Sequence, residues 1–154
     1  MVSNCCNTRT DEDVCPRCRR NAKAVEVVTL KSLLVPEAMK RLDPHAAYHF
    51  CRTVDCPVVY FNGTLVFAKD EVTVRMLQKE STGPLPVCYC FGFTRESIAD
   101  EMERTGTSTA VEQVTRYVKD GKCACELRNP QGSCCLGNVP QAVEQARRAA
   151  GVQR

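Results

Sequence analysis

Short apolar runs that alternate with polar positions dominate the first half of the chain. They cover residues 25–30, 48–50, 58–61, 64–67 and 71–76, and a period of two residues is typical of half-buried β-strands. Asn62-Gly63 stands between two of these runs and is a strong two-residue hairpin signal. A helical patch over 36–42 begins at a proline and is stopped by Pro44. This half is therefore predicted to be a small β-rich module.

The second half has the spacing of helices instead. Thr94 can cap a helix over 95–104 that Gly106 ends, and residues 109–112 form a capping-box pattern that opens a second helix toward Gly121. A last helix is expected over 138–150. The Gly/Pro-rich stretch 81–86 separates the halves. The predicted fold class is thus α+β, with a flexible tail at 1–14, a β-rich module at 15–80 and a helical domain at 86–151.

Charge and motif content argue against several classes of function. The chain of 154 residues has 21 basic and 18 acidic residues, so its net charge of +3 gives no nucleic-acid footprint. No apolar stretch approaches the roughly 20 residues that cross a bilayer. With two histidines, no paired-carboxylate motif and no Gly-rich phosphate loop, the sequence favours a protein that is not an enzyme.

The twelve cysteines change this picture most. They occur as close pairs: Cys5/Cys6, Cys15/Cys18, Cys51/Cys56, Cys88/Cys90, Cys123/Cys125 and Cys134/Cys135. Neighbouring cysteines make strained disulfides but convenient metal ligands. The first residues have neither a basic region nor an apolar run, so no secretory signal is visible. We therefore expect metal sites in a cytoplasmic protein rather than a disulfide framework.

The pairs in the first half suit a zinc site. Cys15 and Cys18 form a Cys-x-x-Cys knuckle, and Cys51 and Cys56 stand in a turn between two expected strands. Together they offer four thiolates, the set of a closed structural zinc site. A thioredoxin-like redox reading fits less well, because the knuckle lacks a strand before it and a helix after it. His49 could replace one cysteine, although a core or surface histidine is the simpler interpretation.

The pairs in the second half suit a [2Fe–2S] cluster, which takes four cysteine sulfurs, two for each iron. Cys88 and Cys90 can curl around one iron, and a pair from beyond the two helices can complete the set. Two cysteine pairs lie there, 123/125 and 134/135, so the residues alone leave the second half of the set open.

These motifs resemble a known family. Cys88-Tyr89-Cys90, two helices and a second cysteine cluster are similar to the bacterioferritin-associated ferredoxin domain, a small helical [2Fe–2S] fold. With the upstream zinc motif and Asn129-Pro130, the chain resembles the N-terminal region of CopZ-type copper chaperones. The resemblance implies that Cys88, Cys90, Cys125 and Cys135 hold the cluster. It also implies that Cys15, Cys18, Cys51 and Cys56 hold Zn²⁺.

The resemblance implies a metallochaperone or electron-transfer protein that supplies electrons to a copper ion before the ion passes to a partner. Expected partners are a heavy-metal transporter or heavy-metal-associated domain protein and a redox partner, with Cu⁺ as a further bound ion. The family's C-terminal heavy-metal domain, with its own Cys-x-x-Cys, is not seen before Arg154. Two alternatives remain: a redox-sensing or docking module with structural metals, and trafficking of copper or mercury through the spare thiols Cys5, Cys6, Cys123 and Cys134.

Overall fold

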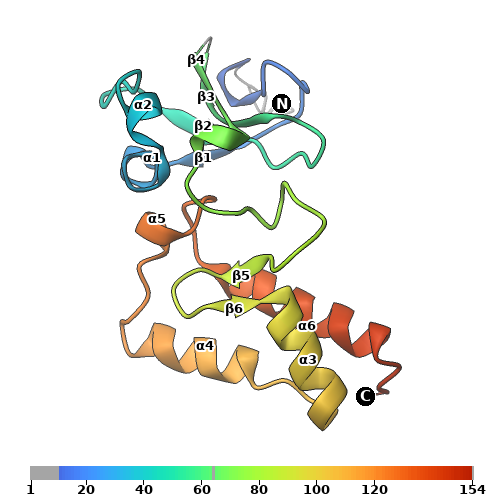
Figure 1. The fold of residues 1–154 in the computed structure, drawn as a ribbon. Coiled ribbons are helices and arrows are strands. Elements are labelled where there is room, and N and C mark those ends of the chain that lie inside the picture. Colours follow the sequence, from blue (N-terminus) through green and yellow to red (C-terminus); the bar gives the residue numbers. More distant parts are fainter. Residues whose placement is uncertain (1–10, 64, 154) are drawn as a thin grey trace, which may run out of the picture.

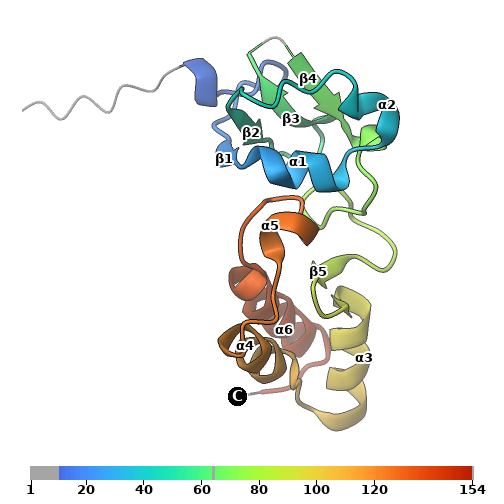
Figure 2. The ribbon, with the colours of Figure 1, turned by 90° about the vertical axis from the view of Figure 1, so that its left-hand side faces the viewer.

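The computed structural model describes residues 11–63 and 65–153. A sheet with two short helices forms one half of the molecule and a group of helices forms the other, as Figures 1 and 2 show from two sides. The first half contains η1 (Asp11–Asp13), β1 (Lys23–Val25), α1 (Val27–Leu33), α2 (Pro36–Met39), β2 (Tyr48–Phe50), β3 (Val58–Asn62), β4 (Leu65–Ala68) and η2 (Lys69–Glu71). The second contains β5 (Pro86–Cys88), β6 (Phe93–Thr94), α3 (Arg95–Thr105), α4 (Ala110–Lys119), α5 (Cys125–Arg128), η3 (Cys135–Gly137) and α6 (Asn138–Ala149). The predicted α+β class is confirmed.

The sheet of the first half is antiparallel and has the strand order β1-β2-β3-β4. The predicted hairpin joins β3 to β4, with Asn62 paired to Leu65 and Gly63 at a φ of 53°. The turn is therefore shifted by one residue from Asn62-Gly63, because Asn62 is still paired within β3. All four residues from Val58 to Phe61 are buried, as expected for one of the two inner strands of the sheet.

Two strand predictions are wrong. Residues 25–30 do not form one strand, because β1 ends at Val25 and α1 follows. The buried positions Thr29, Leu30 and Leu33 have helical spacing, and this face packs inward. The run 71–76 buries Val72 and Met76 as alternation requires, but its backbone forms only an isolated bridge to Leu34 beside α1. Beside this bridge, the Thr73 amide donates to the Leu33 carbonyl and the Val35 amide donates to the Glu71 carbonyl, so the segment pairs with the end of α1.

The helices of the second half follow the sequence signals more closely. Thr94 caps α3 by accepting a hydrogen bond from the Ser97 amide, and Gly106 ends the helix at a φ of 77°. The capping box predicted at residues 109–112 is wrong. The Thr109 hydroxyl instead donates to the Glu101 carboxylate at 2.7 Å, which ties the start of α4 to α3. Both α3 and α4 pack against α6.

The two halves have separate apolar cores but share a polar and tightly packed junction. The buried Tyr60 hydroxyl donates to the Pro130 carbonyl at 2.5 Å, and the Thr29 hydroxyl donates to the Glu126 carbonyl at 2.6 Å. Gly132 lies so close that a Cβ there would stand 2.6 Å from Val25 Cγ2. The loop after α5 is therefore built against the first half, as Figure 2 shows. The limits of the two domains stay a prediction.

The end of the predicted tail is part of the described structure. Residues 11–14, at the end of the predicted tail, include η1 and a bridge between Val14 and Asn21. Cys5 and Cys6 lie outside the described residues.

Within ranges 11–63 and 65–153, no helix has the length and apolar character that a membrane span needs.

Candidate metal centres

The first candidate centre brings the four cysteines of the predicted zinc set together. All four sulfur atoms lie within 4.8 Å of one another. Cys15 Sγ is 3.8 Å from Cys56 Sγ, and Cys18 Sγ is 3.7 Å from Cys51 Sγ. Three of the four residues are buried and Cys18 is half-buried. The arrangement is compact enough for one small cation.

Two backbone turns at the end of the sheet position these sulfurs. In the first turn, the Cys15 amide donates to the Arg20 carbonyl and the Arg19 amide donates to the Cys15 carbonyl. Arg19 has a φ of 60°, which closes the turn. In the second turn, between β2 and β3, the Cys51 amide donates to Val59 and the Cys56 amide to Thr53. We call residues 15–18 the first knuckle and residues 51–56 the second knuckle.

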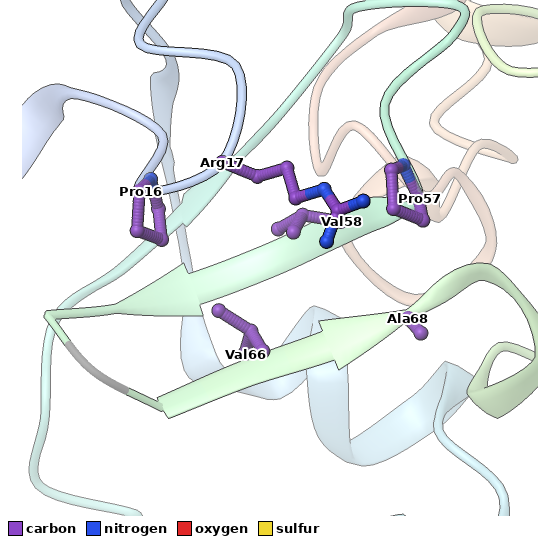
Figure 3. Close-up of a pocket in the computed structure, with 6 residues that line it drawn as sticks. All are labelled: Pro16, Arg17, Pro57, Val58, Val66 and Ala68. Carbon is purple, nitrogen blue, oxygen red and sulfur yellow. The ribbon is translucent and has the colours of Figure 1, made fainter.

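The donor set fits zinc. Zinc–sulfur bonds of about 2.3 Å in a tetrahedron place the sulfurs about 3.8 Å apart, close to the separations of the pairs Cys15–Cys56 and Cys18–Cys51. Four cysteines fill every position of such a site, so it has no open position for a substrate. A pocket of about 300 Å³ lies beside the knuckles, and Figure 3 shows the Arg17 side chain extending across it from the first knuckle toward Pro57. Its lining is mostly aliphatic.

The pKa values of the thiols also indicate a cation. Burial raises the pKa of Cys15 to about 12, and burial likewise raises the pKa of Cys56. Burial acts in the same direction on Cys18, but hydrogen bonds to the Thr53 hydroxyl and the Arg20 backbone outweigh it and lower the pKa to about 6. Cys18 thus releases its proton readily, whereas Cys15 and Cys56 hold theirs. A divalent ion supplies the positive charge that full ionisation requires.

The second candidate centre draws its cysteines from three separate places. Cys88 ends β5 and Cys90 follows it in the loop to β6, whereas Cys125 begins α5 and Cys135 begins η3. Cys88, Cys125 and Cys135 are buried and Cys90 is half-buried. Asn129, itself buried, holds the loop between α5 and η3 by donating to the Ser133 carbonyl and accepting from the Gln131 amide.

The close sulfur contacts of this centre join the segment of Cys88 and Cys90 to the segment of Cys125 and Cys135. Cys90 Sγ is 3.8 Å from Cys125 Sγ, and the thiol of Cys88 is hydrogen-bonded to that of Cys135. The sequence predicts instead that Cys88 and Cys90 are paired with each other around one iron. Two close pairs, each with one sulfur from either segment, still provide two thiolates for each of two irons, so the donor set fits a [2Fe–2S] cluster.

Hydrogen bonds and burial set the acidity of these thiols. The hydrogen bond with Cys135 lowers the pKa of Cys88 to about 6, whereas the same contact and burial raise the pKa of Cys135. Burial raises the pKa of Cys125 to about 12. The Ala124 amide donates to Cys90 Sγ at 3.3 Å. Backbone amides that point at the sulfurs are groups that tune the potential of a bound cluster.

The spare thiols differ in their surroundings. Cys123 is half-buried and packs against the core of the second half, whereas Cys134 is exposed. Cys134 is near enough to raise the pKa of Cys125 and Cys135 through its charge. All ten cysteines that the structure describes are free of disulfide bonds.

Two further residues belong to the first centre, and one candidate does not. His49 is buried, stacks on Phe61 and pairs through Nε2 with Asp13 at 2.9 Å, so a core histidine is what the structure has. Sequence reasoning missed Thr53, whose hydroxyl lies 3.4 Å from Cys18 Sγ, although its place between Cys51 and Cys56 was a signal. It also missed Lys79, which contacts the second knuckle from a distant segment and carried no local signal.

Comparisons with known proteins agree with these two centres. Residues 12–73 match the CopZ zinc binding domain family, and residues 86–129 match the BFD-like [2Fe-2S] binding domain family. The chain is 35% identical over 121 residues to the copper chaperone CopZ of Archaeoglobus fulgidus. That alignment covers 79% of this chain and 57% of the relative, so the chain spans little more than half of the relative's length.

A solved structure extends the match to the fold. The N-terminal domain of the Archaeoglobus fulgidus CopZ superposes with a TM-score of 0.68 at 31% sequence identity. The superposition covers 83% of this chain and 95% of that domain. Both halves of the chain, and the order in which they follow one another, therefore have a counterpart in one relative.

Proposed function

Because the chain belongs to the family of the zinc- and [2Fe–2S]-binding N-terminal region of CopZ copper chaperones, we propose that it is a metallochaperone accessory protein. In this proposal it passes single electrons to a copper ion, and the ion then moves to a partner. The partners would be a heavy-metal transporter or heavy-metal-associated domain protein and a one-electron donor protein. We place it in the cytoplasm and assign it no enzymatic turnover.

The closed form of the first centre supports different roles for the two metal centres. Its four sulfurs leave no coordination position open, so we assign its zinc a structural role. The second centre is then where chemistry would take place. Cys88, Cys90, Cys125 and Cys135 would hold a [2Fe–2S] cluster, which supplies one-electron redox chemistry when bound.

One observation carries the electron-transfer proposal: an exposed thiol stands next to a buried candidate ligand. Cys134 is exposed and Cys135 is buried, in the same loop. Thiolates favour soft ions such as Cu⁺. A copper ion captured at Cys134 would therefore lie one residue away from a sulfur of the cluster. Each Cu²⁺ that becomes Cu⁺ takes up one electron, and the donor protein restores it.

The test is a direct transfer of electrons to copper. Protein reduced with dithionite, and then freed of dithionite, is mixed with Cu²⁺ under anaerobic conditions. We expect the paramagnetic signal of Cu²⁺ to disappear as the visible absorption of the oxidised protein returns, with one copper reduced per cluster. The stoichiometry matters because it ties each copper to one electron from the protein.

The matched control is Cys88→Ser, which removes a buried candidate ligand and leaves every exposed thiol in place. This variant should reduce far less Cu²⁺ than the unchanged protein. Equal reduction by both proteins would assign the electrons to bare thiols and would refute the proposal.

The exposure of Cys134 favours one second candidate function, the trafficking of copper or mercury through spare thiols without electron transfer. The Cu²⁺-reduction experiment distinguishes the two, because trafficking predicts no electron transfer from the cluster, and competition titration with Cu⁺ and a chromophoric chelator tests the binding site itself. Trafficking predicts that Cys134→Ser weakens Cu⁺ binding while the cluster's redox behaviour is unchanged. If the affinity of this variant for Cu⁺ is that of the unchanged protein, Cys134 is no trafficking site.

A further inference from the structure

Lys79 has a buried ammonium group in contact with the second knuckle. The residue is 3% exposed. Its Nζ donates to three backbone carbonyls, those of Val58 at 2.6 Å, Thr53 at 2.8 Å and Cys56 at 3.1 Å. An ammonium has three donors and no acceptor, so these contacts use its full hydrogen-bonding capacity. Buried lysines are rare unless they are paired.

The charge of this group has no conventional partner. In the part of the chain that the structure describes, no carboxylate forms an ion pair with Lys79. The first centre is a candidate for the counter-charge, since Cys56 provides both a carbonyl to Lys79 and a sulfur to the site. Four thiolates around one divalent ion leave two negative charges. A positive group beside the second knuckle offsets part of that charge.

Lys79 belongs to the connection between the two family matches, which we define as residues 74–85. The matched zinc-domain family ends at residue 73 and the matched cluster-domain family begins at residue 86. Lys79 lies between them, in the turn where its own amide donates to the Met76 carbonyl. The connection between the two halves is thus more than a spacer, because one of its side chains reaches back to the cysteine turn.

We propose that Lys79 is a positioning residue of the zinc site. Its ammonium fixes three carbonyls of the residues 53–58 turn, which sets the direction in which Cys51 and Cys56 present their sulfurs. It also lowers the energy of the thiolates by its charge. Retention of zinc therefore depends on the segment that connects the two halves and not on the two knuckles alone. Groups that orient metal ligands in this way typically change metal affinity by about 10–100-fold when removed.

The competing interpretation is that Lys79 only holds the two halves together. The two interpretations differ in their predictions, because a residue that merely joins the halves has no particular effect on the metal. Tyr60→Phe provides the matched control. This change removes a buried hydrogen bond across the junction, to Pro130, and leaves the carbonyls of the second knuckle untouched.

The first measurement is the rate at which zinc passes from the intact, metal-loaded protein to an excess of a chromophoric chelator. Lys79→Met removes the charge and the donors but keeps most of the apolar stem. We expect it to release zinc at least about tenfold faster than the unchanged protein. Tyr60→Phe should release zinc within about twofold of the unchanged protein, and Lys79→Arg, which retains a cation, should lie between the two.

The second measurement separates charge from packing. With Co²⁺ in place of Zn²⁺, the sulfur-to-cobalt charge-transfer band reports the energy of the thiolate electrons. Loss of the cation in Lys79→Met should move this band to longer wavelength, whereas Lys79→Arg and Tyr60→Phe should leave it in place. Zinc release from Lys79→Met at the unchanged rate, or equal acceleration by Tyr60→Phe, would overturn the proposal.

Acylation of the unchanged protein covers the case in which Lys79→Met does not fold. In the zinc-loaded protein an amine-reactive reagent should modify exposed lysines such as Lys40, whose side chain is 68% exposed, and leave Lys79 unmodified. After zinc is removed by a chelator, Lys79 should react. Mass spectrometry of the digested protein gives both results. A Lys79 that reacts as fast as Lys40 in the zinc-loaded protein would refute its role at the site.

Discussion

At the first centre four sulfurs lie within 4.8 Å of one another, whereas at the second Cys90 contacts Cys125 and Cys88 contacts Cys135. The first set comes from two turns at the end of one sheet. The second comes from a strand end, a four-residue helix and a 3₁₀ turn. One ligand type thus serves two purposes: two rigid turns suit a single ion, and loops spread over several elements suit a larger cluster.

The two regions also depend on one another unequally. The loop that contains Pro130 and Gly132 rests on Tyr60, Val25 and Thr29 of the first half. In the other direction, the connection contributes Lys79 to the second knuckle. The second centre should therefore need the first half to be folded, whereas the first centre needs the connection but not the cluster.

The largest effect is expected for Cys51→Ser. Zinc binding supplies folding free energy, about 10 kcal/mol or more for small structural sites, and three thiolates would not retain it. We expect the first half to unfold and, because the second cysteine loop rests on it, the iron content to fall as well. Elemental analysis and near-ultraviolet circular dichroism measure both. One zinc per chain in the variant would contradict the prediction.

Cys88→Ser should have the more restricted effect. Cys88 is fully buried and hydrogen-bonded to Cys135, so its loss should abolish the visible absorption of the cluster. Zinc should stay at one per chain, because Cys88 lies in the core of the second half and the four cysteines of the first centre lie in another cluster. Iron and zinc analysis after anaerobic purification gives the result.

The neighbouring cysteines supply the control for that experiment. Cys135→Ser should lose the cluster like Cys88→Ser, whereas Cys134→Ser, which changes an exposed residue, should keep it. If Cys134→Ser loses its colour and Cys135→Ser does not, the assignment of this ligand is wrong.

A smaller effect is expected at the junction. Gly132 has a φ of 69°, and a Cβ there would stand 2.6 Å from Val25 Cγ2. Gly121 has a similar φ of 71° but open space around it, so it is the matched control. We expect Gly121→Ala to cost about 1 kcal/mol and Gly132→Ala roughly 2–4 kcal/mol of unfolding free energy. Equal losses in denaturant melts would show that the halves are not in close contact.

The smallest effect concerns acid sensitivity of the helical half. Hydrogen bonding to Thr109 lowers the pKa of Glu101, with Ser108 adding to it. A carboxyl whose pKa is depressed in the folded state stabilises the protein at pH values above the ordinary pKa of about 4.3. That contribution is lost as the pH falls through the depressed pKa of the folded state. Titration of the Glu101 carboxyl by nuclear magnetic resonance should find a midpoint below 4.3. A midpoint at or above it would contradict the contact.

The local signals of the sequence were sufficient for part of this structure. The spacing of Cys15 with Cys18 and of Cys51 with Cys56 identified the residues that the fold brings together, because each pair belongs to one turn. Thr94 and Gly106 gave the ends of α3 for the same reason. The roles of the four cysteines as zinc ligands stay a prediction.

Several of the misses involve distant contacts. Apolar residues at 25–30 fit either a strand or a helix, and packing of Thr29 and Leu30 decides for the helix. Spacing alone could not separate Cys125 from Cys123, or Cys135 from Cys134, since each pair differs in burial only after the chain folds. Lys79 is an ordinary lysine in the sequence and becomes part of a metal site through three contacts that span 21 to 26 residues.

The position of Gly132 against Val25 has a consequence for biosynthesis. The N-terminal half leaves the ribosome first and can acquire its ion before residues 129–135 have been translated. The surface formed by Val25, Thr29 and Tyr60 is then complete when the glycine loop arrives and packs against it. We therefore expect maturation to have a direction, with zinc first and iron and sulfide second. A cell starved of zinc would then accumulate the chain with both centres unfilled, however much iron it contained.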